Sequence, residues 1–335
     1  MEGEEGMGMF GLPTGKPTRQ AFGETLVELG RQRPELVVLD GDLSKSTYTR
    51  YFAKEFPDRF FNVGIAEANM VGLAAGLASC GKIPVCASFA AFLMCKAFDQ
   101  MRIAVNYAGL NVKFVGSHGG ISIGEDGVSQ MAVEDVALAQ ALPGFVVLVP
   151  ADEPATRRVV AAALEHPGPV YIRVGRPKAP LVYDSRPFDF AIGKAVTVRE
   201  GRDLTIAANG LMVAAALVAA ERLAAEGIEA RVLDFACVKP LDRDAVQAAA
   251  EETGALVVAE EHLKAGGLGS AIAMALAETV PVPAEFVAIQ DTYAESGDPE
   301  QLMQKYGLSP DAIVTAARRA LERKRAGVAG TASRH

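Results

Sequence analysis

The 335-residue sequence has no tryptophan, few cysteines and no apolar run long enough to cross a membrane. The four cysteines form no C-x-x-C pair and lie in apolar segments, which argues against both a disulfide framework and a zinc site. The longest apolar stretches fall well short of the ~18 residues that a membrane-spanning helix requires. The N-terminal segment is acidic and glycine-rich, whereas a secretion signal has a cationic and then an apolar segment. These absences predict a reduced, cytoplasmic protein.

Positive charge is also scarce, since 33 lysines and arginines stand against 41 aspartates and glutamates, for a net charge of -8. This balance argues against a protein that binds nucleic acid or anionic membranes. An anionic substrate would therefore have to be bound by a few well-placed cations. Half of the residues are hydrophobic and 22% are charged, as in ordinary globular proteins, and the length predicts about two domains.

Strand-like and helix-like segments alternate along almost the whole chain. A helical pattern runs from Thr18 to Gly30, and buried-strand patterns follow it at 36–39, 60–63, 83–87, 112–116, 145–149 and 170–174. A second series has strand patterns at 204–207, 230–234, 256–259 and 285–289 and a last helix at 310–325. Such alternation predicts an α/β fold of two domains, each a mostly parallel sheet with helices on both faces.

Three prolines interrupt this pattern between Arg176 and Pro187, and this loop is the best candidate for a domain boundary. Segments that resemble mobile tails flank the two domains. The predicted division is an N-terminal tail at 1–16, a first domain at 17–185, a second domain at 186–326 and a C-terminal tail at 327–335.

A lone carboxylate, Glu67, lies at a predicted strand-to-helix junction within the otherwise apolar segment 60–73. A glutamate in the first turn of a helix has a common structural role, because it favours the positive end of the helix dipole. Alternatively, Glu67 is a buried acid that exchanges a proton with a nitrogen of a ligand. The residues alone leave both roles open.

Segment 116–130 contains more glycine, serine and polar residues than a structural turn after a strand needs. Loops at the carboxyl ends of parallel strands are where α/β proteins bind ligands, so we expect a binding loop, with a plain surface loop as the alternative. Its His118-Gly119-Gly120 sequence is similar to the oxyanion loop of lipases. The chain has no G-x-S-x-G nucleophile elbow, which argues against that hydrolase class.

The second domain carries a glycine-rich segment at 266–270 that lacks the G-x-G-x-x-G spacing of a dinucleotide site. We expect it to be the structural start of a helix. Just before it, Glu260, Glu261 and His262 are adjacent in sequence, and adjacent residues rarely converge on one metal ion. We expect these three residues to lie in a solvated loop.

Taken together, these segments resemble the C-terminal two-thirds of transketolases over nearly the whole chain, from about residue 18 to about 325. The resemblance rests on eight motifs that occur in the same order. These are Thr18-Arg19-Gln20-Ala21-Phe22-Gly23, Asp40-Gly41-Asp42 ahead of Ser46-Thr47, Ile65-Ala66-Glu67, Phe89-Ala90-Ala91-Phe92, Ser117-His118, Gly124-Glu125-Asp126-Gly127, Arg173-Val174-Gly175-Arg176-Pro177 and Val238-Lys239-Pro240-Leu241-Asp242.

The resemblance implies a pyrimidine-binding domain for thiamine diphosphate, followed by a transketolase C-terminal domain. Glu67 matches the glutamate that hydrogen-bonds N1′ of the cofactor's aminopyrimidine and favours the tautomer that activates the thiazolium carbon. Phe92 matches the aromatic residue that stacks on the pyrimidine, with Phe89 beside it, although core packing also explains both residues. Asp42 matches an acid at the cofactor interface. Gln130, which we assign to the same set, stands where many members have histidine and others have glutamine.

The resemblance also implies a substrate site for sugar phosphates. Arg19, Ser46, His118 and Arg176 match the set that binds the phosphate group. Arginines and a hydroxyl suit a dianionic phosphoryl group, and they would supply the local positive charge that an acidic chain otherwise lacks. Asp126 matches the acid that contacts a substrate hydroxyl near the reacting carbon.

Transketolases bind the diphosphate and its Mg²⁺ through an N-terminal domain that carries Gly-Asp-Gly and a later asparagine. Asp40-Gly41-Asp42 is a different motif, and no cluster of oxygen ligands for Mg²⁺ is evident, so no metal ligand is assigned here. The resemblance therefore implies a split transketolase that depends on thiamine diphosphate and Mg²⁺. An N-terminal transketolase subunit would supply the diphosphate-binding domain, and this chain would self-associate across a two-fold axis.

The implied activity is the transfer of a two-carbon unit from a ketose phosphate to an aldose phosphate. A beta subunit of a 2-oxo acid dehydrogenase also lacks the diphosphate domain, but it has no need for sugar-phosphate ligands. Deoxyxylulose phosphate synthase resembles segment 64–67, but it normally comes as one long chain. A split transketolase for an unusual sugar stays open. A non-catalytic partner subunit is the alternative of a different class, and the presence of Glu67, Phe92 and Asp126 argues against it.

Overall fold

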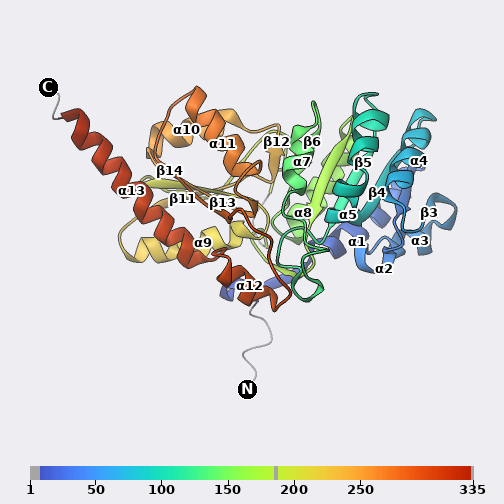
Figure 1. Cartoon of the computed structure of the whole chain (residues 1–335), viewed down its shortest axis with the longest axis horizontal. Coiled ribbons are helices and arrows are strands. Elements are labelled where there is room, and N and C mark those ends of the chain that lie inside the picture. Colours follow the sequence, from blue (N-terminus) through green and yellow to red (C-terminus); the bar gives the residue numbers. More distant parts are fainter. Residues whose placement is uncertain (1–7, 185–187, 333–335) are drawn as a thin grey trace, which may run out of the picture.

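A computed structural model describes residues 8–184 and 188–332 of the chain, with side chains up to residue 326. Two sheets lie side by side, each covered by helices (Figure 1). The predicted α/β class with two domains of mostly parallel sheet is confirmed. The predicted boundary at residue 185 lies outside the described residues.

The first sheet has seven strands in the order β12-β6-β7-β5-β4-β2-β3. They are β2 (Leu36–Asp40), β3 (Phe60–Asn62), β4 (Ile83–Phe89), β5 (Lys113–Ser117), β6 (Val146–Leu148), β7 (Val170–Val174) and β12 (Cys237–Lys239). All neighbours are parallel except β12, which pairs antiparallel with β6. Strands β2, β5 and β7 are buried along their whole length, which explains the apolar run 36–39 in β2. Lys113 in β5 and Arg173 in β7 are buried with them.

Helices cover both faces of this sheet. One face carries α1 (Thr18–Gln32), α3 (Arg50–Glu55) and α8 (Glu153–Glu165), whose apolar residues form one core with β2, β4 and β7. The other face carries α4 (Glu67–Ser79), α5 (Ala90–Lys96) and α7 (Asp135–Ala141). Short connecting elements complete the domain: η1 (Met9–Gly11), α2 (Ser44–Thr47), η2 (Pro57–Arg59), α6 (Phe98–Gln100), the π-helix η3 (Met101–Asn106) and η4 (Gly124–Asp126).

The second sheet has five strands in the order β14-β13-β10-β11-β9. They are β9 (Val196–Arg199), β10 (Leu204–Ala208), β11 (Ala230–Asp234), β13 (Leu256–Leu263) and β14 (Ala284–Ile289), and β9 alone in this sheet is antiparallel to its neighbour. Its helices are α9 (Met212–Ala225), α10 (Arg243–Thr253), α11 (Leu268–Glu278), α12 (Pro299–Lys305) and α13 (Pro310–Ala332). Helix α13 extends away from the body of the molecule in Figure 1.

The two domains share structure. Strand β12 comes from the second half of the chain but completes the edge of the first sheet. The apolar core under α4, α5 and α7 also continues without a break into α10 and α11. The domains are therefore joined by a common core as well as by a linker.

Three expectations about irregular segments are wrong. Residues predicted to be a tail before 17 form η1 and strand β1 (Thr14–Pro17), and β1 pairs with β8 (Lys178–Pro180) inside the segment predicted to be a loop. Residues 260–262 lie buried within β13 and not in a solvated loop, because the strand runs on to Leu263. Helix α13 continues past residue 326, where a tail is predicted, as far as Ala332.

Among the helices of the described residues, none combines the length and the apolar character needed to cross a membrane.

Candidate functional site

The candidate site lies at the carboxyl ends of β2, β4 and β5. Because these strands are parallel neighbours, the residues that follow them meet at one edge of the first sheet. Helix α4, which begins with Glu67, follows β3 at the same edge. The topology therefore gathers segments that lie far apart in the sequence.

Glu67 is the first residue of α4 and is only 2% exposed. Its Oε1 accepts a hydrogen bond of 3.1 Å from Oγ of Ser88, at the end of β4. A Cβ atom added at Gly41 would lie 3.6 Å from this oxygen, so the backbone after β2 passes close to the carboxylate. The structure thus makes Glu67 both a first-turn residue and a buried acid, and its exchange of a proton with a ligand stays a prediction.

Two phenylalanines, on β4 and α5, form a ring pair that Lys96 connects to Glu67. The rings of Phe89 and Phe92 stack with centroids 5.4 Å apart. Lys96, at the end of α5, places its Nζ 3.6 Å from Oε2 of Glu67 and 4.2 Å from the centre of the Phe92 ring. Sequence reasoning missed Lys96, because nothing in the pattern of an exposed lysine indicates a contact with a carboxylate 29 positions earlier.

Arg19, in the first turn of α1, contacts the other three predicted phosphate-binding residues. Its Nη1 donates to the backbone oxygen of Ser46 at 2.8 Å and lies 3.3 Å from Nε2 of His118, while its Nε donates to the backbone oxygen of Arg176 at 3.3 Å. All four residues predicted for this site therefore come together. Ser46 accepts this hydrogen bond from Arg19 through its backbone carbonyl oxygen and not through its hydroxyl group.

His118 follows β5 with a positive φ of 61°, an uncommon conformation for a residue other than glycine. Its ring stacks on Phe89 at 3.8 Å, and its Nδ1 lies 2.9 Å from Oγ of Ser117. Because Nε2 accepts from Arg19, the proton belongs on Nδ1, which donates to Ser117. Burial, with the charges of Arg19 and Arg176, lowers the pKa of His118 to about 3, so the ring is neutral at physiological pH.

The other predicted residues lie around this centre. Nη1 of Arg176 donates to Oε2 of Glu125 at 2.8 Å, a contact that sequence reasoning did not predict. Asp126 is exposed in the same short helix η4, and Gln130 accepts a hydrogen bond of 2.5 Å from Oγ of Ser129. Asp42 is exposed, and its Oδ1 accepts from the amide of Asn62 at 2.8 Å. The functional roles of these residues stay predictions.

The residues around Glu67 suit a planar, heteroaromatic ligand. A buried carboxylate next to a phenylalanine ring fits a planar heteroaromatic ring with a nitrogen that donates a proton. Within the described residues, no group of three or more His, Cys, Asp or Glu side chains could hold a metal ion.

Comparison with known proteins agrees with the geometry. Residues 15–181 match the transketolase pyrimidine-binding domain, and residues 193–313 match the transketolase C-terminal domain. The chain belongs to the transketolase family. It contains the pyrimidine-binding and C-terminal domains of this family in the order that the sequence predicts.

Relatives within the transketolase family include subunits of split enzymes. The chain is 45% identical, over 91% of its own length and 95% of the relative's, to the 6-deoxy-6-sulfo-D-fructose transketolase subunit SqwH of Clostridium sp. (strain MSTE9). It is 39% identical, over 88% and 94% of the two chains, to an apulose-4-phosphate transketolase subunit of Phocaeicola vulgatus. A solved split-gene transketolase, described as an inactive β4 tetramer, has 49% identity and a TM-score of 0.86, covering 92% of this chain and all of that one.

Proposed function

We propose that this chain is one subunit of a cytoplasmic split transketolase that depends on thiamine diphosphate and Mg²⁺. It would transfer a two-carbon unit from a ketose phosphate to an aldose phosphate. The observation that carries the proposal is the buried carboxylate of Glu67, which lies beside Phe92 at the strand ends where α/β proteins bind ligands. Two relatives are named as transketolase subunits, which supports an enzyme divided into separate chains.

In this proposal, the residues of the chain hold and orient the cofactor's pyrimidine ring. Phe92 would stack on the ring, and Glu67 would share a proton with its N1′ nitrogen, held in place by Ser88. When bound, thiamine diphosphate supplies the carbon nucleophile that takes up the two-carbon unit. A partner subunit would bind the diphosphate and the Mg²⁺, and the tetramer formed by the solved relative supports self-association as well.

The substrate side of the proposal rests on two arginines in a protein of net negative charge. Arg19 and Arg176 would bind the anionic end of the sugar, and Nε2 of neutral His118 would accept a hydrogen bond there. The two relatives act on different sugars, one named for a sulfonated and one for a phosphorylated sugar. We therefore propose an anionic sugar as the substrate class, with a sugar phosphate as the first candidate.

An assay of xylulose 5-phosphate with ribose 5-phosphate, thiamine diphosphate and Mg²⁺ tests this proposal. The chain is assayed alone and after co-expression with a candidate partner that carries the Gly-Asp-Gly motif. Activity in the mixture alone is the expected result. A stable complex that is inactive with phosphorylated and sulfonated sugars alike would point to the non-catalytic alternative.

A further inference from the structure

Residues 118–133, which make up all but the last residue of the segment between β5 and α7, carry His118 and Asp126, and we refer to them as the substrate loop. Its two ends lie side by side, because Gly119 and Gly120 form isolated bridges with Ala132 and the Gly120 amide donates to the Ala132 oxygen at 2.7 Å. Between these ends, the short helix η4 is its one regular element among the described residues. A loop of this kind needs contacts from outside to hold one conformation.

The C-terminal domain supplies such contacts. Oε1 of Glu261, on β13, accepts a hydrogen bond of 2.7 Å from the backbone amide of Ser122 in the loop. Both groups are buried, with Glu261 7% exposed and Ser122 fully covered. A charged acceptor on a buried amide is among the stronger hydrogen bonds in proteins. One carboxylate of the second domain thus fixes the loop four residues after His118.

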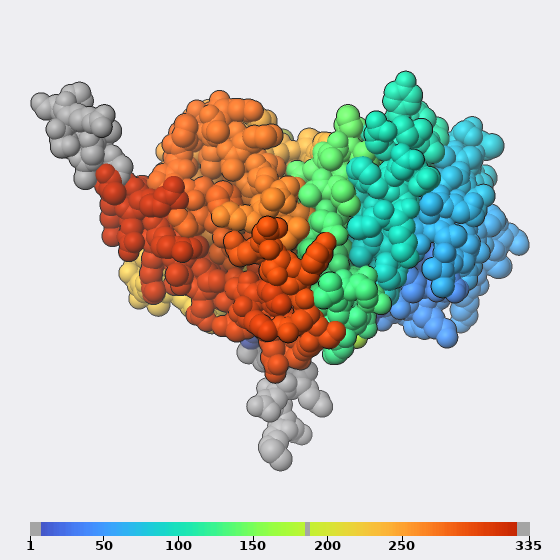
Figure 2. All heavy atoms as spheres, in the orientation of Figure 1, coloured from blue at the N-terminus to red at the C-terminus, as the bar shows by residue number. Residues whose placement is uncertain are grey.

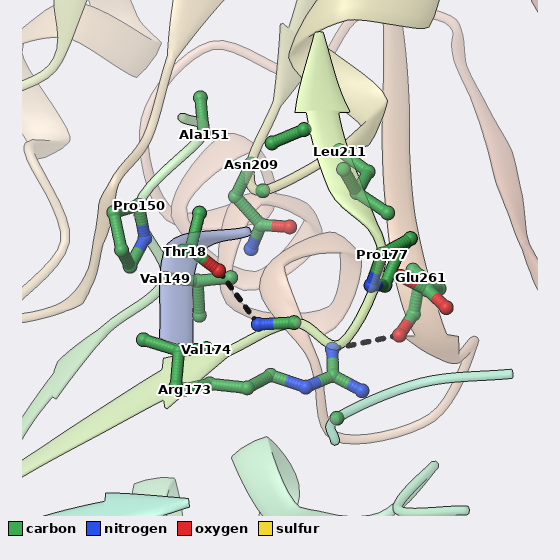
Figure 3. Close-up of a pocket in the computed structure, with 14 residues that line it drawn as sticks. Thr18, Val149, Pro150, Ala151, Arg173, Val174, Pro177, Asn209, Leu211 and Glu261 are labelled. Atoms are coloured by element: carbon green, nitrogen blue, oxygen red, sulfur yellow. Dashed lines mark hydrogen bonds between the residues drawn. The ribbon is translucent and has the colours of Figure 1, made fainter. Parts of the chain in front are cut away.

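Arg173 completes this connection from the first domain. As Figure 3 shows, its guanidinium reaches Glu261, and the Nη1 atom donates to the backbone oxygen of Glu261 at 2.7 Å. Nη2 donates to the oxygen of Ala132 at 2.7 Å, and Nε lies 3.2 Å from Oδ2 of Asp135. The same buried cation therefore holds β13 and the far end of the substrate loop together.

Glycines in the loop are required by this close approach. A Cβ added at Gly119 would collide with the Arg173 side chain, and one added at Gly120 would collide with the Glu261 carboxylate. Further along, Gly124 packs against Pro299, the first residue of α12, and Gly127 packs against Ser296 in the segment before that helix. In Figure 2 the green surface of the loop lies directly against the orange-red surface of that segment. The loop is held from two sides by the second domain.

We infer that Glu261 is a positioning residue for the substrate loop, so that the C-terminal domain sets the place of His118 and Asp126 relative to the sugar. The expected change in KM rests on the proposed function. The expected effect on the conformation of the loop does not. Neighbouring Glu260 has no such role, because its carboxylate accepts from the amides of Leu268 and Gly269 at 2.7 and 2.8 Å, at the start of α11 within its own domain.

Glu260 therefore provides a matched control for the test. Both glutamates are buried, adjacent and bonded to backbone amides, but only Glu261 contacts the loop. In the complex with its partner, Glu261→Met is expected to raise KM for the sugar phosphates about tenfold while kcat changes less than about threefold. Glu260→Met should leave KM within about twofold of the wild type. Glu261→Gln, which keeps an oxygen for Ser122, should restore most of the wild-type KM.

Hydrogen exchange of the full chain gives a readout that does not depend on activity. In the wild type, the Ser122 amide should exchange more slowly than the amides of the exposed residues Val128 and Ser129 in the same loop. Glu261→Met should accelerate exchange across 118–133, and Glu260→Met should not. Fast exchange at Ser122 in the wild type, or equal effects of the two variants, would overturn the inference. Slow exchange with no transketolase activity would instead contradict the proposed function alone.

Discussion

The ammonium nitrogen of Lys96 lies 3.6 Å from the buried carboxylate of Glu67 and 4.2 Å from the ring centre of Phe92. One cation thus contacts both residues assigned to the pyrimidine ring of the cofactor. A ring that stacks on Phe92 and donates to Glu67 would compete with Lys96 for these two residues. Lys96, whose side chain is half exposed, must therefore move outward when such a ring enters.

Removal of this lysine is expected to strengthen cofactor binding. Lys96→Met keeps the length of the side chain but gives up the ion pair, so the cofactor no longer competes with an internal cation. We expect thiamine diphosphate to bind the reconstituted complex about twofold to tenfold more tightly, as measured by calorimetric titration. Lys82→Met, at an exposed position just before β4 and at the opposite end of that strand from Phe89, serves as the control and should leave the affinity unchanged. Weaker binding by Lys96→Met would show that the lysine helps to hold the cofactor.

Replacement of Glu67 by glutamine tests the proton-sharing role directly. Glutamine fits the same volume and retains an oxygen for Ser88, but it lacks a carboxylate that can take up a proton. We expect the kcat of the complex to fall at least about 100-fold, with little change in the thermal midpoint of unfolding. Ser88→Ala, which removes the neighbour and keeps the acid, should cost much less activity. If Glu67→Gln retained wild-type turnover, the assignment of Glu67 would be wrong.

Loss of Arg176 should affect anionic substrates selectively. Its guanidinium is held by Glu125 and by the backbone oxygen of Ile123. Its charge is close enough to Arg19 and His118 to lower the pKa of both groups. We expect Arg176→Ala to raise KM for phosphorylated sugars about tenfold or more, and for unphosphorylated sugars much less. Glu125→Gln, which removes the competing anion and keeps the arginine, should not raise KM for either class. Equal increases for both classes would count against a phosphate-binding role.

The convergence of Arg19, Ser46, His118 and Arg176 could be predicted from the sequence, because parallel strands and a resemblance to transketolases place all four at one sheet edge. The role of Glu261 could not be predicted in this way, since it depends on how β13 of one domain approaches a loop of the other. The same holds for β1, whose four residues gain strand structure by pairing with β8, more than 160 positions later. Local patterns thus identify strand ends and the residues that follow them. They contain no information on contacts between domains.

His118 leads to a prediction about the pH dependence of stability. Its pKa is lowered to about 3 by burial and by Arg19 and Arg176, whereas an unfolded histidine titrates near 6.5. Between these values the unfolded chain binds a proton that the folded chain excludes. The contribution of His118 is therefore fully present above pH 6.5 and is lost as the pH falls toward 3, by about 1.4 kcal/mol per pH unit at most.

Comparison of the wild type with His118→Asn isolates this contribution. We expect the difference between their thermal midpoints to be constant above pH 7. As the pH falls from 6 to 4, the midpoint of the wild type should fall more than that of the variant. The ring protons of His118, followed by NMR, should show no titration between pH 8 and pH 5. A titration near pH 6.5 would contradict a neutral, buried ring.

Lys113 leads to a prediction about the pH dependence of stability above pH 7. The residue begins β5 and is 1% exposed, and its Nζ donates to the backbone oxygens of His166 and Gly168 at 2.6 and 2.5 Å. Burial lowers the pKa of Lys113 to about 7, compared with 10.5 for a free lysine. Between pH 7 and 10.5 the unfolded chain carries a proton here that the folded chain lacks, so this residue makes stability rise with pH across that range.

Lys113→Met removes this dependence, because methionine has a similar length and no proton to lose. The advantage of the variant over the wild type in thermal midpoint should be largest at pH 7 and should decrease toward pH 10. His166, whose pKa burial and Lys113 hold below the usual 6.5, does not titrate in this range. Lys82→Met, which removes an exposed lysine, should show no such trend. A difference between wild type and Lys113→Met that stays constant from pH 7 to 10 would mean that Lys113 remains charged inside the fold, held by its two carbonyl partners.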